Sequence, residues 1–194
     1  GIPWRVAFAL QDDGWYLRQD IIWAKPNPMP ESVKDRCTKS HEYIFLLTKS
    51  AKYYYDAEAI KEESMNIGET NAKFGGNKYG DNDSKKHLTY SGNKYTDNGK
   101  RNKRDVWTIT TKPYSEAHFA TFPVALPELC IKAGSKEKDL VLDPFAGAGT
   151  TGLVADRLGR DAVLIELNPK YVKMIEDRIR NDAPMFVDIQ TFQT

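Results

Sequence analysis

The sequence contains few cysteines, few histidines and no long apolar run, and each scarcity excludes a class of protein. Its 194 residues include two cysteines and three scattered histidines, too few for a disulfide framework or a four-ligand zinc site. No apolar stretch reaches the roughly 20 residues that span a bilayer. The N-terminus lacks the basic and apolar segments of a signal peptide. We therefore expect a cytoplasmic protein without a metal and without a membrane partner.

An excess of charge of one sign is also missing, because the formal net charge is only +1. A nucleic-acid partner must therefore be argued from where the charges lie in the chain. The composition, with 40% hydrophobic and 28% charged residues, is typical of a globular protein. A chain of this length accommodates one domain with a substantial core and a modest insertion.

Hydrophobic patterning predicts regular structure on both sides of a polar central stretch. Before that stretch we expect a helix over 3–10, strands over 15–23 and 41–47, and Tyr53–Tyr55 as hairpin partner of the second strand. After it we expect helices over 126–133, 150–158 and 169–180, and strands over 140–143 and 162–166. The regular alternation of strand and helix predicts an α/β fold with a parallel sheet.

The central stretch, residues 61–105, loses hydrophobic periodicity and is rich in glycine, asparagine, lysine and tyrosine. The pattern Gly-Asn-Lys-Tyr-x-Asp-Asn occurs in it twice, at 76–82 and 92–98. Between residues 73 and 104, nine lysines and arginines stand against three aspartates, so the nearly neutral chain contains a basic segment. We interpret 61–105 as an insertion in one domain made of residues 1–60 and 106–194.

A glycine-rich turn lies between a predicted strand and a predicted helix, where open α/β sheets bind ligands. Gly147, Gly149 and Gly152 satisfy the spacing G-x-G-x-x-G, and Glu166 follows at the distance of a ribose-binding acid. Asp143 would repel a pyrophosphate at the end of the strand, which argues against NAD. The sulfonium and ammonium groups of S-adenosylmethionine would be attracted there. A tight turn without a ligand is the plainer alternative.

Several segments resemble motifs of one family. Asp143-Pro-Phe-Ala-Gly-Ala-Gly-Thr-Thr and Ile165-Glu-Leu-Asn-Pro-Lys-Tyr resemble the two cofactor motifs of the bacterial and phage DNA amino-methyltransferases. Residues 118–123 are similar to the segment that lines the methionine end of the cofactor site. Residues 15–23, 25–28 and 41–45 resemble later sheet motifs of the same enzymes. The cofactor motif follows the insertion, as in the permuted class called beta, in which the insertion recognises the target.

The resemblance implies a Rossmann-like sheet with helices on both faces and a circularly permuted motif order. It implies S-adenosylmethionine as cofactor and duplex DNA as partner, with methyl transfer to N4 of cytosine or N6 of adenine in a flipped base, as in restriction-modification. The implied cofactor-binding residues are His118, Phe119, Ala120, Phe122, Asp143, Pro144, Phe145, Ala146, Gly147, Gly149, Thr150, Thr151, Glu166, Leu167 and Asn168. The implied DNA-binding residues are Lys25, Arg36, Lys100, Arg101, Lys103 and Arg104, which composition alone explains equally as solvated surface charges.

The catalytic motif of the family, Ser/Asp/Asn-Pro-Pro-Tyr/Phe, has no counterpart, since no Pro-Pro occurs in the sequence. We therefore assign no catalytic residue and expect an N-terminally truncated chain, whose sheet is incomplete or completed by a partner. Neither cysteine follows a proline, which argues against the carbon-5 cytosine enzymes. Three alternatives stay open: an RNA or small-molecule methyltransferase, a catalytically inactive DNA-binding fragment, and an NAD-dependent oxidoreductase.

Overall fold

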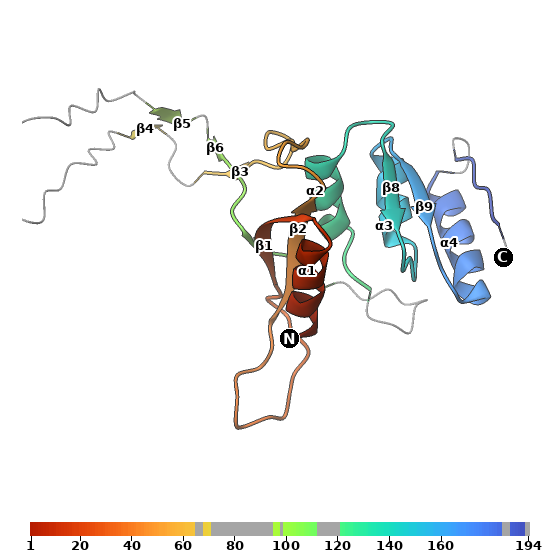
Figure 1. Ribbon diagram of the computed structural model, residues 1–194, viewed down its shortest axis with the longest axis horizontal. Coiled ribbons are helices and arrows are strands. Elements are labelled where there is room, and N and C mark those ends of the chain that lie inside the picture. The colour runs from red at the N-terminus through yellow and green to blue at the C-terminus, as the bar shows by residue number, and fades with distance from the viewer. Residues whose placement is uncertain (65–67, 71–94, 98, 112–120, 184–186, 193–194) are drawn as a thin grey trace, which may run out of the picture. The chain divides into compact units, whose positions relative to one another are not determined.

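The computed structural model describes residues 1–64, 68–70, 95–97, 99–111, 121–183 and 187–192 (Figure 1). Contacts between residues divide the chain into two compact units, which we treat separately. The larger unit combines Gly1–Ile60 with Arg104–Thr194, and the smaller one consists of Lys61–Lys103. In the described part of the chain, no helix has the length and apolar character needed to cross a membrane.

The N-terminal part of the larger unit is a helix followed by two long strands, as the hydrophobic pattern predicts. They are α1 (Ile2–Asp12), β1 (Tyr16–Ala24) and β2 (His41–Thr48). β1 and β2 are antiparallel, and a register shift interrupts their pairing between Leu17 and Gln19. Trp4 of α1 packs edge-on against the rings of Tyr43 and Phe45 on β2, which fixes the helix to the sheet.

A short strand that the sequence did not predict completes this sheet. β7 (Val106–Thr108) pairs with β1 in parallel and gives the strand order β2-β1-β7. The indole nitrogen of Trp23 donates a hydrogen bond to the carbonyl oxygen of Ile109 at 2.8 Å. The chain after the central stretch is thereby anchored to the strand that precedes it.

The prediction of a hairpin partner at Tyr53–Tyr55 is wrong. The pairing partner of β2 is β1, along its whole length, and Tyr53–Tyr55 forms an irregular segment. The backbone continues from there to α2 (Ala125–Gly134), where the N–H of Asp56 donates to the carbonyl oxygen of Ala133 at 2.9 Å. Three consecutive aromatic residues favour a strand, but here a contact with a helix end determines the path of the chain.

The C-terminal part of the larger unit is a parallel β-α-β unit followed by a helix. The elements are β8 (Leu140–Asp143), α3 (Thr150–Arg157), β9 (Asp161–Leu164) and α4 (Pro169–Asp182). β8 and β9 pair in parallel, as expected for strands joined by a crossover helix. Leu153 of α3 and Ile175 and Ile179 of α4 form a buried cluster. This part confirms the predicted alternation, with boundaries shifted by at most two residues.

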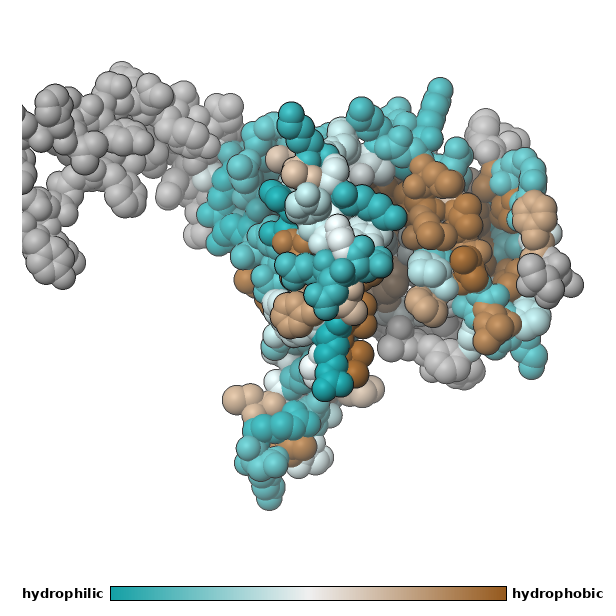
Figure 2. Space-filling model, viewed as in Figure 1, coloured by the Kyte–Doolittle hydropathy of each residue, from teal (hydrophilic) through white to brown (hydrophobic). Residues whose placement is uncertain are grey.

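One face of the β8–β9 pair is exposed. Val141 and Leu164 pack against buried clusters that include residues of α3. The alternate residues Leu140, Leu142, Val163 and Ile165 are between 44% and 65% exposed. Figure 2 shows apolar side chains gathered in the region of β8 and β9. Parallel sheets usually have both faces covered, and in the described residues this pair is covered on one.

The smaller unit contains two short antiparallel ladders. β3 (Glu62–Glu63) pairs with β6 (Lys100–Arg101), and β4 (Gly68–Thr70) pairs with β5 (Tyr95–Asp97). The two ends of the unit are therefore hydrogen-bonded to each other. The first copy of the repeated seven-residue pattern, 76–82, lies outside the described residues, as does most of the second copy.

Candidate cofactor site

The turn after β8 is organised by the carboxylate of Asp143, at the carboxyl end of that strand. Its Oδ1 accepts a hydrogen bond from the backbone N–H of Phe145 at 3.0 Å, and its Oδ2 accepts one from the hydroxyl of Thr151 at 2.5 Å. The carboxylate therefore joins the strand end, the turn and the first turn of α3. Each oxygen keeps a further lone pair, so this role is compatible with attracting a cation.

Two glycines in the turn adopt backbone conformations that other residues rarely reach. Gly147 has φ +52° and Gly149 has φ +71°, both in the left-handed region. A Cβ at Gly149 would lie 2.9 Å from Cγ1 and Cγ2 of Ile175 on α4. The turn is thus packed so closely against α4 that glycine is required there for space as well as for conformation.

Glu166, two residues after β9, reaches the turn from the neighbouring strand. Its Oε2 accepts from the backbone N–H of Gly147 at 2.8 Å, and its Oε1 accepts from the N–H of Asn168 at 2.9 Å. The two acidic residues singled out in the sequence therefore both contact the glycine turn. Both Glu166 oxygens retain acceptor capacity, which suits the two adjacent hydroxyls of a ribose.

Apolar side chains are exposed beside these carboxylates. Phe145 is 88% exposed and Leu167 is 97% exposed. They follow the carboxyl ends of two paired parallel strands, which places them at the same edge of the sheet. A planar, partly apolar ligand such as a nucleoside would find both hydrogen-bond acceptors and apolar surface at this edge.

The remaining predicted cofactor residues differ in their surroundings. Ala146 and Thr150 are buried, Pro144 is exposed, and Phe122 is half-buried in the segment before α2. Asn168 caps α4, since its side-chain oxygen accepts from the N–H of Lys170 at 3.0 Å. His118, Phe119 and Ala120 lie outside the described residues.

Two predicted DNA-binding residues before the smaller unit have acidic partners. Lys25 pairs with Glu42, and its ammonium lies 4.4 Å from the centre of the Trp23 ring. Arg36 donates from Nη1 to Glu31 at 2.7 Å. Exposed pairs of this kind are weak, so both cations can exchange their partner for a phosphate.

The cluster of basic residues at 100–104 is divided between paired and exposed side chains. Arg101 and Lys103 both contact the carboxylate of Glu62, at 2.9 Å and 3.4 Å. Lys100 and Arg104 are exposed. The structure therefore brings Arg101 and Lys103 together on one acidic residue, which the composition of the segment did not reveal.

Arg178 of α4 is a residue of the site that sequence reasoning missed. Its Nη1 donates to the carbonyl oxygen of Ala148 at 2.7 Å and to the hydroxyl oxygen of Thr150 at 3.1 Å. No local motif connects an arginine with a turn about thirty residues earlier. The expected helix over 169–180 was the only available signal, because it placed Arg178 on an element next to the turn.

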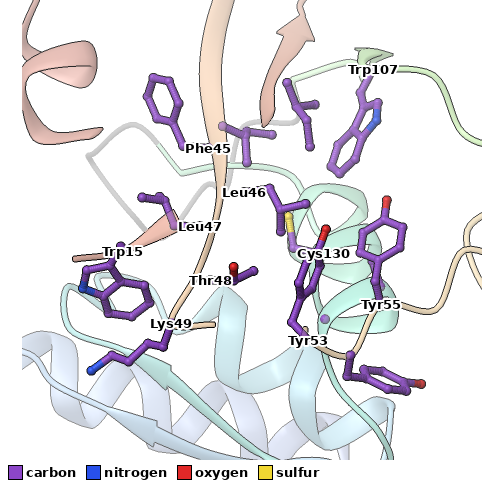
Figure 3. A pocket seen from close by; sticks show the side chains of 15 residues that line it. Trp15, Phe45, Leu46, Leu47, Thr48, Lys49, Tyr53, Tyr55, Trp107 and Cys130 are labelled. Atoms are coloured by element: carbon purple, nitrogen blue, oxygen red, sulfur yellow. The ribbon is translucent and has the colours of Figure 1, made fainter. Parts of the chain in front are cut away.

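A separate pocket lies between β2, the Tyr53–Tyr55 segment and α2 (Figure 3). It has a volume of about 360 Å³ and a mainly apolar and aromatic lining. Tyr53 lies beside Cys130 in it, and Lys49 lies beside Trp15. Burial raises the pKa of the Cys130 thiol to about 11, although the residue keeps accessible surface. No residue of the glycine turn lines this pocket, so it is not part of the cofactor site.

Comparison with known families decides between the nucleotide-binding alternatives. Residues 2–177 match the N6/N4 methyltransferase family, described as DNA methylase. The chain belongs to this family. An NAD-dependent oxidoreductase is therefore excluded, and the resemblance carried by the sequence motifs is confirmed.

Members of the DNA methylase family share half of their residues with this chain. The Type II methyltransferase M.Cfr9I of Citrobacter freundii is 50% identical over 182 residues, which are 94% of this chain and 50% of the relative. The Type II methyltransferase M.SmaI of Serratia marcescens is 50% identical over 179 residues, covering 92% and 51%. The chain thus spans about half the length of these relatives.

Solved structures of the family have the same fold. The PvuII DNA methyltransferase, described as cytosine-N4-specific, aligns with a TM-score of 0.62 at 21% identity, over 98% of this chain and 58% of its own. A complex of M1.HpyAVI with S-adenosylmethionine aligns with a TM-score of 0.59 at 23% identity, over 90% and 68%. The predicted α/β, Rossmann-like methyltransferase fold is confirmed.

Proposed function

We propose that this chain carries the cofactor-binding and DNA-contacting part of a DNA amino-methyltransferase. The observation that supports this most strongly is the convergence of Asp143 and Glu166 on one glycine turn between parallel strands. Membership of the DNA methylase family gives that turn its ligand class. Relatives that are half identical are named Type II methyltransferases, so the substrate proposed here is duplex DNA, reached in the cytoplasm.

S-adenosylmethionine fits the residues of the turn by charge and by hydrogen-bonding capacity. Glu166 would accept hydrogen bonds from the ribose hydroxyls, and Asp143 would attract the positively charged methionine end. Phe145 and Leu167 would cover the faces of the nucleoside base with apolar surface. Bound at this site, the cofactor supplies an electrophilic methyl group, which direct in-line transfer moves to an amine.

The acceptor proposed is N4 of cytosine or N6 of adenine in a base rotated out of the duplex. Lys25, Arg36, Lys100, Arg101, Lys103 and Arg104 would contact the DNA backbone and make its affinity dependent on salt. Base choice would come from residues of the 61–105 segment that reach base edges.

A second candidate function is binding of cofactor and DNA without methyl transfer. The specific observation in its favour is the absence of any Pro-Pro pair from the sequence, because the family uses that motif to hold the target amine. On this alternative the chain alone binds both ligands but needs the missing loop in order to react.

The test is transfer of labelled methyl from S-adenosylmethionine to unmethylated duplex DNA, followed by digestion to nucleosides. It uses this chain and a version extended upstream with the corresponding half of a relative. Label in N4-methylcytosine or N6-methyladenine from the extended chain alone supports the proposal and identifies the base. Label from neither chain, with DNA binding retained, supports the binding function. Equal activity on RNA would contradict the DNA substrate.

A further inference from the structure

Arg178 contacts the cofactor turn from the opposite side to Glu166. The carbonyl oxygen of Ala148 and the hydroxyl oxygen of Thr150 both accept from its Nη1, at 2.7 Å and 3.1 Å. These two acceptors flank Gly149, the residue with φ +71°. Glu166 meanwhile accepts from the N–H of Gly147 at 2.8 Å. The stretch from 147 to 150 is therefore fixed by one charged side chain on each side.

The acceptors of Arg178 are buried, which makes their hydrogen bonds consequential. Ala148 is 7% exposed and Thr150 is 4% exposed. A buried acceptor that loses its only partner costs about 1–3 kcal/mol, and bonds from a charged donor are stronger than neutral ones. Truncation of Arg178 would remove a donor from both groups at once, and the turn would relax toward water.

The position of the charge argues against a purely electrostatic role for Arg178. Thr150 is the first residue of α3, and the N-terminus of a helix carries a partial positive charge that disfavours a cation. An arginine is nevertheless found there, half-buried, with its donors directed at the turn. Its two directional hydrogen bonds account for its presence, whereas favourable interaction with the helix dipole does not.

We propose that Arg178 is a positioning residue for cofactor binding. It holds the carbonyl of Ala148 and the hydroxyl of Thr150 in place, and so keeps Gly147 and Glu166 in the arrangement that receives the ribose. This inference rests on the proposed function, because it assigns S-adenosylmethionine to the turn. It adds a residue outside both sequence motifs, on a helix face that would otherwise only pack.

A matched control exists in the same pair of helices. Arg157 of α3 pairs with Asp182 of α4, with Nε to Oδ2 at 2.7 Å and Nη2 to Oδ1 at 2.5 Å. This pair links α3 to α4 as Arg178 does, but it does not contact the turn. Arg157→Met therefore reports the effect of losing an interhelical arginine contact alone.

The experiment measures the affinity of the full chain for S-adenosylmethionine by calorimetry, together with urea unfolding. Arg178→Met should weaken cofactor binding about tenfold, while Arg157→Met leaves it within about twofold. Arg178→Lys keeps the charge and one donor group, so it should recover part of the affinity and guards against a variant that fails to fold. DNA affinity should be equal in all variants.

Two other results have distinct meanings. If wild type binds the cofactor and Arg178→Met and Arg178→Lys bind it equally well, Arg178 only packs α4 against α3 and the inference is overturned. If wild type does not bind S-adenosylmethionine, the proposed function itself fails. Parallel unfolding curves for Arg178→Met and Arg157→Met, combined with a cofactor defect in the first alone, support the positioning role.

Discussion

Glu166 and Glu62 are both carboxylates with two hydrogen-bonding or charged partners, but the partners differ in kind. Glu166 accepts from two backbone N–H groups in the cofactor turn. Glu62, in the smaller unit, contacts the side chains of Arg101 and Lys103. Backbone donors cannot leave without deforming the chain, whereas long cationic side chains can rotate toward another anion. The first arrangement suits a preformed ligand site, and the second suits a surface that exchanges partners.

The rigidity assigned to the cofactor turn is tested most strongly at Gly149. Alanine there would have to adopt φ +71° and would place its Cβ 2.9 Å from two carbons of the buried Ile175. We expect a loss of about 3 kcal/mol in the free energy of unfolding, from backbone strain and overpacking together. Urea denaturation measures it.

Gly159 provides the control for that substitution. It has φ +68°, but a Cβ there meets nothing within 4 Å. Gly159→Ala should therefore cost only the backbone strain, about 1 kcal/mol. Equal losses for the two variants would show that the contact between the turn and α4 is not restrictive.

The second test removes the carboxylate of the turn. Glu166→Ala leaves the N–H groups of Gly147 and Asn168 without their acceptor, and it removes the proposed partner of the ribose. We expect cofactor affinity to fall about 30-fold, equivalent to about 2 kcal/mol, as measured by calorimetry. Glu166→Gln retains one acceptor oxygen and should lose less. A variant that binds as tightly as wild type would remove Glu166 from the site.

The third test changes the carboxylate of the smaller unit. Glu62→Gln frees Arg101 and Lys103 from a negative charge, so we expect affinity for duplex DNA to rise about threefold at low salt, with a steeper salt dependence. Fluorescence anisotropy at two salt concentrations measures both. Cofactor affinity should stay constant, just as DNA affinity should be unchanged in Glu166→Gln. A decrease in DNA affinity would mean that Glu62 orders the cations for binding.

The smallest effect is expected from a cation–carboxylate pair inside the larger unit. The hydrogen bond from Arg157 holds the pKa of Asp182 below its ordinary value. The stabilisation is therefore present above the unfolded-state pKa of about 3.9 and is lost as pH falls through the lower folded-state value. Both side chains are partly exposed, so Asp182→Asn should cost only about 0.5 kcal/mol at pH 7. The difference between wild type and variant in urea unfolding should vanish near pH 2.

The sequence predicted those parts of the fold in which local pattern and tertiary structure agree. Pro169 after the capping Asn168 marked the start of α4, and the apolar run 140–143 marked β8, because both signals act over a few residues. It could not predict β7, whose three residues become a strand only through pairing with β1. It also misassigned Tyr53–Tyr55, since the choice between a hairpin and a helix contact depends on residue 133, far along the chain.

The same distinction applies to the cofactor site. Asp143, Gly147, Gly149 and Glu166 were found because their spacing is a recognisable pattern, and the structure brings them together. Their hydrogen bonds to Phe145, Thr151 and Asn168 were not foreseen, because a spacing rule does not specify donors. Arg178 was missed because it acts through a contact between elements that are distant in sequence.

The exposed face of the β8–β9 pair has a consequence for the behaviour of the chain in solution. Leu140, Leu142, Val163 and Ile165 present branched apolar side chains in alternate positions on two adjacent strands. Such a strip attracts apolar dyes and other copies of the same surface. Solubility should therefore fall as protein concentration rises, and light scattering should increase well before the chain unfolds. Lysine substitutions at Leu140 and Leu142 would suppress this association without altering the turn at the end of the strand.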